Sequence, residues 1–207
     1  MTISGMFNAD YFLHVQEHLL ISAVSVALAC AVGIPLGILA SGNKALKKAL
    51  SGIFSTLRVI PSIAVLLLCL PIMGTGFFTA VAALTVLAIP PVFINTALAF
   101  GSIPEAVLET AMAMGMSRLR TFFLVRVPLS LPFMIAGIKT ATVEVLASAT
   151  LAAYIGAGGL GAIIFTGLGL LRTDLLLIGG ISVAALSIAA DILLSCLETQ
   201  VVRYKNR

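Results

Sequence analysis

The chain of 207 residues has little charge: Asp, Glu, Lys and Arg make up 10% of it, whereas hydrophobic residues make up 60%. Soluble domains carry about 25% charged residues. The shortage therefore excludes an ordinary soluble domain and predicts a protein that crosses a membrane several times. The formal net charge of +4 does not indicate nucleic-acid binding, because the basic residues cluster at the ends of apolar runs.

Several motifs of other protein classes are missing. No P-loop pattern G-x-x-x-x-G-K-[ST] occurs, so the chain cannot hold ATP phosphates by that route. Cys30, Cys69 and Cys196 lie inside apolar runs and are expected to be core residues rather than disulfide or metal ligands. Residues 1–18 contain no Lys or Arg, so no signal peptide is expected.

Five apolar stretches are long enough to cross the roughly 30 Å hydrocarbon core at about 1.5 Å per residue. The predicted spans are 19–40, 52–70, 77–99, 131–154 and 175–197. The turn between the second and third is expected at Pro71, Gly74 and Gly76. Glycine and proline residues are expected to bend the far half of the first span, namely Gly33, Pro35 and Gly37. Residues 162–171 are predicted as a short helix that lies on the membrane surface or dips into it.

The basic residues are unevenly divided between the two sides that five spans define. One side holds Lys44, Lys47, Lys48, Arg118, Arg120, Arg126, Arg203, Lys205 and Arg207. The other side holds Arg172. By the positive-inside rule the first side is cytoplasmic, which puts the N-terminus outside and the C-terminus inside.

The polar stretch 102–128 separates two apolar runs and must therefore contact water or a partner. Ser102 and Glu105 form the S-x-x-E pattern of a capping box, which predicts a helix start with Pro104 in the first turn. The apolar stripe of this helix consists of Val107, Leu108, Ala111, Met112 and Gly115. Gly115 is expected to end or bend the helix. A second short helix is predicted to carry Arg118, Arg120 and Arg126.

The same stretch resembles the EAA loop of ABC-importer permeases, whose pattern is E-A-A, three residues, G, nine residues and I-x-L-P. Glu109 and Ala111 begin and end the E-A-A element, Gly115 follows after three residues, and Pro128 closes the pattern. The modest departures are Thr110 for Ala, Val125 for Ile and Val127 for Leu. The resemblance implies a cytoplasmic coupling helix that docks on a separate ATPase subunit through Glu109, Ala111, Gly115 and Pro128. It also implies that residues 1–207 form one all-α transmembrane domain with the type I ABC-importer permease fold.

A wider resemblance covers about residues 34–191. Residues 136–143 (AGIKTATV), 149–161 (ATLAAYIGAGGLG) and 60–62 (IPS) are similar to permeases of osmoprotectant importers, which move glycine betaine, choline, carnitine and related quaternary amines. The chain departs from this group at Arg58, Lys139, Glu144 and Ala162. Permeases of importers for methionine or another amino-acid-derived solute are the close alternative, because the methionine permeases match in length and number of spans.

The resemblance implies that this chain is a transport subunit rather than an enzyme, with no cofactor or metal of its own. Its partners would be ATPase subunits that hold ATP and Mg, an extracytoplasmic solute-binding protein, a second permease copy, identical or homologous, and lipid. The location would be the cytoplasmic (inner) membrane of a prokaryote. High-affinity selection is expected on the binding protein, since the chain has no Trp and three Tyr for a cation–π cage.

Two further classes compete with this interpretation. A secondary transporter or channel subunit would need a relay of several intramembrane ionisable residues. A membrane scaffold that transports nothing would not need the docking loop.

Two charged residues are expected within the membrane, where isolated charges are costly: Arg58 in the second span and Glu144 in the fourth. Lys139 and Glu144 are separated by about 500° of helix rotation and do not share a face. Arg58 is therefore the expected partner of Glu144, unless Glu144 faces a subunit interface. The candidate pathway or gate residues are Arg58, Pro61, Ser62, Glu144, Tyr154, Gly156, Gly158, Gly159 and Gly161. Residues 156–161 are expected to be a flexible turn that forms the outer gate with Tyr154.

Two familiar motifs have a different meaning in this context. Residues 14–18 (HVQEH) match the H-x-x-E-H zinc pattern, but no third ligand is near, so a short interfacial helix is expected. Residues 156–161 match G-x-G-x-x-G in form. A dinucleotide site would need a preceding strand, and a membrane span precedes these residues instead.

Overall fold

The computed structural model describes residues 9–205, with side chains described as far as residue 201. All regular structure in this range is helical. The elements in chain order are α1 (Ala9–Ser41), α2 (Lys44–Leu57), α3 (Ser62–Met73), α4 (Phe77–Gly101), α5 (Glu105–Ala113), α6 (Arg118–Thr121), the π-helical turn η2 (Phe122–Arg126), α7 (Val127–Ala152), the 3-10 turn η3 (Ala153–Ile155), α8 (Leu160–Gly169) and α9 (Thr173–Lys205).

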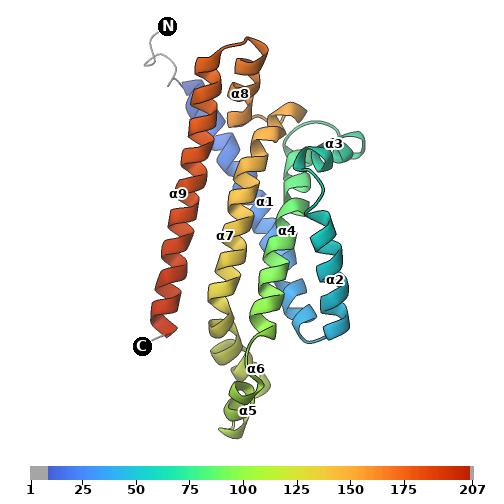
Figure 1. Cartoon of the computed structure of the whole chain (residues 1–207), viewed down its shortest axis with the longest axis vertical. Helices are drawn as coiled ribbons and strands as arrows, with labels where there is room; N and C mark the ends of the chain where they lie inside the picture. The colour runs from blue at the N-terminus through green and yellow to red at the C-terminus, as the bar shows by residue number, and fades with distance from the viewer. Residues whose placement is uncertain (1–8, 206–207) are drawn as a thin grey trace.

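Four long helices, α1, α4, α7 and α9, run lengthwise through the molecule (Figure 1). Each belongs to a helical stretch of the described chain that is long and apolar enough to cross a membrane. α4 packs against α1, α7, α3 and α2, and 61% of its apolar window is buried, against 11% for α9. α4 therefore forms the core of the bundle, while α9 presents most of its apolar surface to lipid or to another subunit.

The long helices approach α4 closely where they carry glycine. A Cβ added to Gly37 of α1 would lie 2.7 Å from Cβ of Thr96, and one added to Gly137 of α7 would lie 2.6 Å from Cβ of Asn95. Small residues let helix backbones approach, which strengthens van der Waals packing in lipid. Gly37, one of the residues expected to bend the first span, therefore makes a packing contact with α4. α1 continues through Pro35 as one helix.

The predicted second span, 52–70, is wrong as a single straight helix. α2 and α3 are instead bent by 93° relative to each other, so the described residues contain a fifth span only if this broken pair counts as one. Pro61 explains the break, because its ring removes a donor and disfavours the helical conformation of the residue before it. It precedes α3 with an extended ψ of 136°. The next turn lies where the sequence predicts it, at Gly74 and Gly76.

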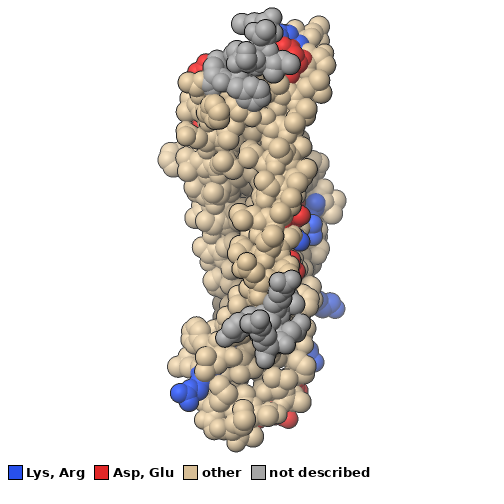
Figure 2. All heavy atoms as spheres, turned by 90° about the vertical axis from the view of Figure 1, so that its left-hand side faces the viewer, with Lys and Arg blue, Asp and Glu red and all other residues tan. Residues whose placement is uncertain are grey.

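The two ends of the molecule carry different parts of the chain. α5, α6 and the end of α9 lie at one end, whereas α8 and the start of α1 lie toward the other (Figure 1). The turn between α1 and α2 also lies toward the α5 end, and α2 begins there with Lys44. Figure 2 shows a face covered mostly by uncharged residues, with charged side chains at the ends and along one edge. The basic loops 41–51 and 102–128 therefore share one end, as their charge predicts.

Candidate functional site

The segment between α4 and α7 projects beyond the long helices (Figure 1). α5 ends at Ala113, and Gly115 follows in the left-handed region with φ +81°. The Gly115 N–H donates to the Met112 carbonyl at 2.9 Å, and the Met116 N–H donates to the Ala111 carbonyl at 3.2 Å. These bonds close the last turn, as glycine commonly does at a helix end. Gly115 therefore ends the helix, as the sequence predicts.

The capping box predicted at the start of α5 is wrong. Ser102 Oγ donates to the Ala99 carbonyl at 3.0 Å, and the Ser102 N–H donates to the Leu98 carbonyl at 2.9 Å. Both bonds close the end of α4, which continues to Gly101 and leaves Ser102 with φ −94° and ψ −3°. An N-cap needs a non-helical, typically extended backbone. α5 begins after Pro104 instead, with no side-chain cap.

The second short helix of this segment is not separate from the fourth span. α6 continues through η2 into α7, so the helical stretch runs Arg118–Ile155, with Pro128 in the first turn of α7. The Arg126 guanidinium lies 5.5 Å from the centre of the Phe100 ring, and Phe100 stacks on Phe122 at 5.8 Å. These contacts hold the base of the segment against the end of α4.

A shallow apolar groove of about 370 Å³ opens beside α5. It is lined by Ala106, Val107, Thr110, Ala111, Met114, Met116 and Val125. Met114 and Leu119 are each 73% exposed despite their large apolar side chains. Glu109 is exposed and Ala111 is buried, so the helix turns its acidic residue outward. Exposed apolar patches rimmed by polar residues mark interaction sites, and methionine adapts well to a partner's surface.

A cavity of about 250 Å³ lies at the break between α2 and α3. It is lined by Leu57, Arg58, Val59, Ile60, Pro61, Ser62, Leu87, Pro90, Glu144 and Ser148. The break, α4 and α7 all contribute to this lining. The structure thus brings together several of the predicted pathway residues, namely Arg58, Pro61, Ser62 and Glu144.

Arg58 and Glu144 line the same cavity and interact electrostatically, as the sequence predicts, but they do not form a close ion pair. Among the described residues, no ion pair within 4.0 Å joins these two side chains. The break accounts for the difference, because it holds Arg58 at the C-cap of α2 instead of on a straight helix beside α7.

The glycine-rich stretch 156–161 links η3 to α8. Its residues with positive φ are Gly156, Gly158 and Gly159. Glu17 of α1 accepts a hydrogen bond from the Gly159 N–H at 2.8 Å. A Cβ at Gly161 would lie 1.9 Å from the Thr150 carbonyl oxygen, so α8 begins in close contact with α7. The stretch expected to be a flexible turn is therefore packed against two long helices.

The residues of the H-x-x-E-H pattern take part in the same packing. His14 Nδ1 lies 3.2 Å from the Glu17 carboxylate. His18 is fully buried, and its Nε2 donates to the Leu146 carbonyl at 3.1 Å. No group of three His, Cys, Asp or Glu side chains is placed to hold a metal ion within the described part of the chain. Sequence reasoning missed these roles of Glu17 and His18, because their partners lie 142 and 128 residues away.

Tyr154 is separate from the cavity. Its side chain is 62% exposed, its ring lies 5.8 Å from that of Phe165 on α8, and it does not line the cavity. The predicted pathway residues therefore form two groups, one at the helix break and one around the glycine-rich stretch.

In the turn between α8 and α9, Arg172 Nε donates to Asp174 at 3.1 Å. The hydrogen bond to Asp174 raises the pKa of the Arg172 guanidinium.

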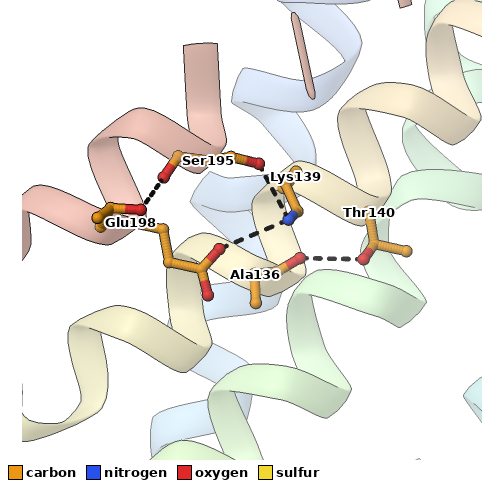
Figure 3. A network of polar contacts seen from close by, with 6 residues as sticks. Ala136, Lys139, Thr140, Ser195 and Glu198 are labelled. Atoms are coloured by element: carbon orange, nitrogen blue, oxygen red, sulfur yellow. Dashed lines mark hydrogen bonds and ion pairs between the residues drawn. The ribbon is translucent and has the colours of Figure 1, made fainter. Parts of the chain in front are cut away.

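Lys139 points toward α9 (Figure 3). Its Nζ donates to Ser195 Oγ at 3.3 Å and lies 3.5 Å from the Glu198 carboxylate. The predicted separation of Lys139 and Glu144 onto different faces of one helix agrees with this arrangement. Lys139 thus joins α7 to α9, while Glu144 lines the cavity.

Long apolar helices, a cavity with two charged residues and a projecting segment with an apolar groove are typical of a multi-pass membrane transport protein. The family described as binding-protein-dependent transport system inner membrane component matches residues 33–203. The chain belongs to this family and is a permease subunit of the ABC-importer type.

Curated relatives match nearly the whole chain. The chain is 38% identical over 182 residues to the carnitine transport permease protein OpuCB of Listeria monocytogenes. The matched residues make up 88% of this chain and 84% of that protein. It is 35% identical over 201 residues to the glycine betaine/carnitine/choline transport system permease protein OpuCB of Bacillus subtilis, with 97% and 93% covered.

Solved structures show the same fold. The chain is similar to the MetNI methionine ABC transporter in an inward-facing conformation, with a TM-score of 0.76 and 24% identity over 95% of this chain and 99% of that one. An amino acid ABC transporter with histidines gives a TM-score of 0.74 at 17% identity, with 97% and 100% covered. The fold is therefore that of a type I ABC-importer permease.

Proposed function

We propose that this chain is the permease subunit of an ATP-driven importer for a small osmoprotectant of the quaternary-amine class, such as glycine betaine, carnitine or choline. The names of two relatives, each matched over 84% or more of its length, support this cargo. Two permease copies, identical or homologous, form the pathway in the cytoplasmic membrane of a prokaryote. A solute-binding protein delivers the cargo to the outer end, where α8 lies.

The exposed groove beside α5 is the observation that supports an ATP-driven importer, because it offers a docking site for an ATPase subunit. Met114, which lines the groove, and Leu119 of α6 are large apolar side chains exposed to water in the isolated chain. Burying each against a partner contributes about 1.5–3 kcal/mol. An ATPase subunit that holds ATP and Mg is the proposed occupant, because nothing in the printed sequence can hold ATP phosphates as a P-loop does.

The proposed docking residues divide into two kinds. Glu109 and Pro128 are exposed and are proposed to contact the ATPase. Ala111 is buried and Gly115 adopts a left-handed conformation, so both are proposed to shape the segment. Docking from the cytoplasm follows from the basic residues, since positively charged loops remain inside.

Uptake by the complete reconstituted complex tests this proposal. Liposomes containing the permease, its ATPase subunits and its binding protein are offered labelled glycine betaine, carnitine, choline or methionine separately. We expect ATP-dependent accumulation of at least one quaternary amine, at a higher rate than that of methionine. An ATPase variant that binds but does not hydrolyse ATP is the matched control. Faster accumulation of methionine than of the quaternary amines would refute the proposed cargo. So would the absence of accumulation of any of the four solutes.

A further inference from the structure

The cavity at the helix break contains two opposite charges. Arg58 is positioned by the end of α2, and Glu144 is carried by α7. Leu87 and Pro90 of α4 are buried and form an apolar wall beside them. Ionisable residues at membrane depth are rare and commonly mark a solute or ion pathway. The position of this pair in a cavity therefore indicates contact with a solute.

Two other basic residues of the chain have ion-pair partners. Lys139 lies within 3.5 Å of Glu198, and Arg172 is paired with Asp174. Arg58 and Glu144 attract each other over a longer distance, and neither has an ion-pair partner within 4.0 Å among the described residues. Arg58 can therefore receive an anionic group in the cavity, and Glu144 a cationic group.

We infer that this cavity is a transit subsite for a zwitterion, in which Arg58 receives the carboxylate and Glu144 the ammonium group. The inference rests on the proposed function and adds that passage is faster for quaternary amines that also carry a carboxylate. A planar guanidinium offers two parallel N–H donors that match a carboxylate. A quaternary ammonium has no N–H, so its attraction to Glu144 is Coulombic and needs no fixed hydrogen-bond geometry.

The size and lining of the cavity suit brief, weak binding. Its volume of about 250 Å³ is below the roughly 300–1,000 Å³ of sites for drug-sized ligands, as expected for a smaller solute. None of its lining residues, all of which belong to the described part of the chain, is aromatic. Aromatic cages are what recognise quaternary ammonium groups strongly. High-affinity capture therefore stays with the binding protein, and this subsite discriminates between solutes during passage.

Glycine betaine and choline separate the two charges experimentally, because choline has the ammonium group but no carboxylate. The measurement is the initial uptake rate of each by the complete complex, with the binding protein saturated with that solute. We expect Arg58→Gln to lower the ratio of the betaine rate to the choline rate about tenfold, because charge-assisted hydrogen bonds to the carboxylate are lost. We expect Glu144→Gln to slow both solutes by a similar factor.

Lys139→Gln is the matched control for charge. It removes a positive charge from α7 at a contact with α9, away from the cavity, so the ratio should stay unchanged. An equal loss of both solutes in Arg58→Gln would assign Arg58 a structural role and overturn the inference. If that variant does not assemble, Arg58→Lys replaces it. Lysine keeps the charge without the two-pronged donor geometry, and a ratio unaffected by Arg58→Lys would likewise overturn the inference.

The same assay separates failure of the inference from failure of the proposed function. Uptake of choline but of no zwitterion by the unchanged complex overturns the subsite and leaves the proposed function standing. If the unchanged complex carries no quaternary amine, the proposed function fails. The effect of Arg58→Gln is then measured on the ratio of the methionine uptake rate to the uptake rate of methionine methyl ester. These two solutes differ at the same carboxylate, so a lowered ratio supports the subsite. Uptake of neither solute overturns both.

Discussion

Gly115 shows how one residue sets the path of the projecting segment. Its φ of +81° lies in the left-handed region, and a Cβ built there would meet no atom within 4 Å. Space therefore does not require glycine at this position, but the backbone conformation favours it strongly. A residue that avoids this conformation would change the direction in which the chain leaves α5.

Gly115→Leu and Gly115→Asn form a matched pair at this turn. The left-handed conformation costs most residues about 1–2 kcal/mol, whereas Asn adopts it more readily. We expect Gly115→Leu to insert normally but to lower the amount of solute moved per ATP hydrolysed severalfold, and Gly115→Asn to keep most of the coupling. Uptake and hydrolysis are measured in the same liposomes. Full ATP-driven uptake by Gly115→Leu would show that the turn does not matter for coupling.

The sequence predicts single residues well where a local pattern determines their conformation. Gly115 is identified because a helical stripe stops at a glycine. Ser102 is misassigned because a serine hydroxyl can accept at a helix start or donate at a helix end, and only the extent of α4 decides between them. The contact of Glu17 with Gly159 has no local signal, because it joins residues 142 positions apart.

Close contacts between helix backbones hold the bundle together. α4 is the helix against which α1 and α7 pack, and each approaches it at a glycine: Gly37 and Gly137. Lipid tails solvate apolar side chains about as favourably as the interior of a protein does. Tight van der Waals packing between helices is therefore what favours their association. The glycines of α1 therefore matter for stability.

Gly37→Ala and Gly180→Ala test this packing with the same chemical change. A Cβ at Gly37 would lie 2.7 Å from Cβ of Thr96, whereas one at Gly180 of α9 would meet nothing within 4 Å. We expect Gly37→Ala to cost roughly 1–3 kcal/mol by overpacking and to lower the midpoint of thermal unfolding. Gly180→Ala should leave the midpoint unchanged or raise it, because alanine favours helix more than glycine does. Equal midpoints for the two variants would contradict this packing role of Gly37.

The positions of the long helices follow from the apolar runs, because crossing the bilayer demands a minimum length. The angle between elements is not predicted in the same way. Residues 52–70 satisfy the length and composition of a span, yet Pro61 divides them into helices bent by 93°. Hydropathy averages over this residue, so the cavity created by the break cannot be read from the apolar pattern.

The bundle as a whole has two distinct ends, which differ in charge and in the elements that they carry. The loops 41–51 and 102–128 share the end of the bundle from which α5 projects (Figure 1). The sequence predicts that they share an end, because this depends on a sum over many basic residues. The sequence predicts that Arg58 and Glu144 lie near each other, but the cavity that both line depends on how α2, α3, α4 and α7 assemble.

An ATPase subunit docked at the α5 end is proposed to supply the energy for transport. This proposal is tested by comparing energy sources in liposomes that contain the permease and its binding protein. With ATPase subunits present and ATP confined to the α5 side, we predict accumulation of glycine betaine without any ion gradient. A proton or sodium gradient alone should drive none. Accumulation driven by such a gradient in liposomes that lack the ATPase subunits would contradict the claim and identify a secondary transporter.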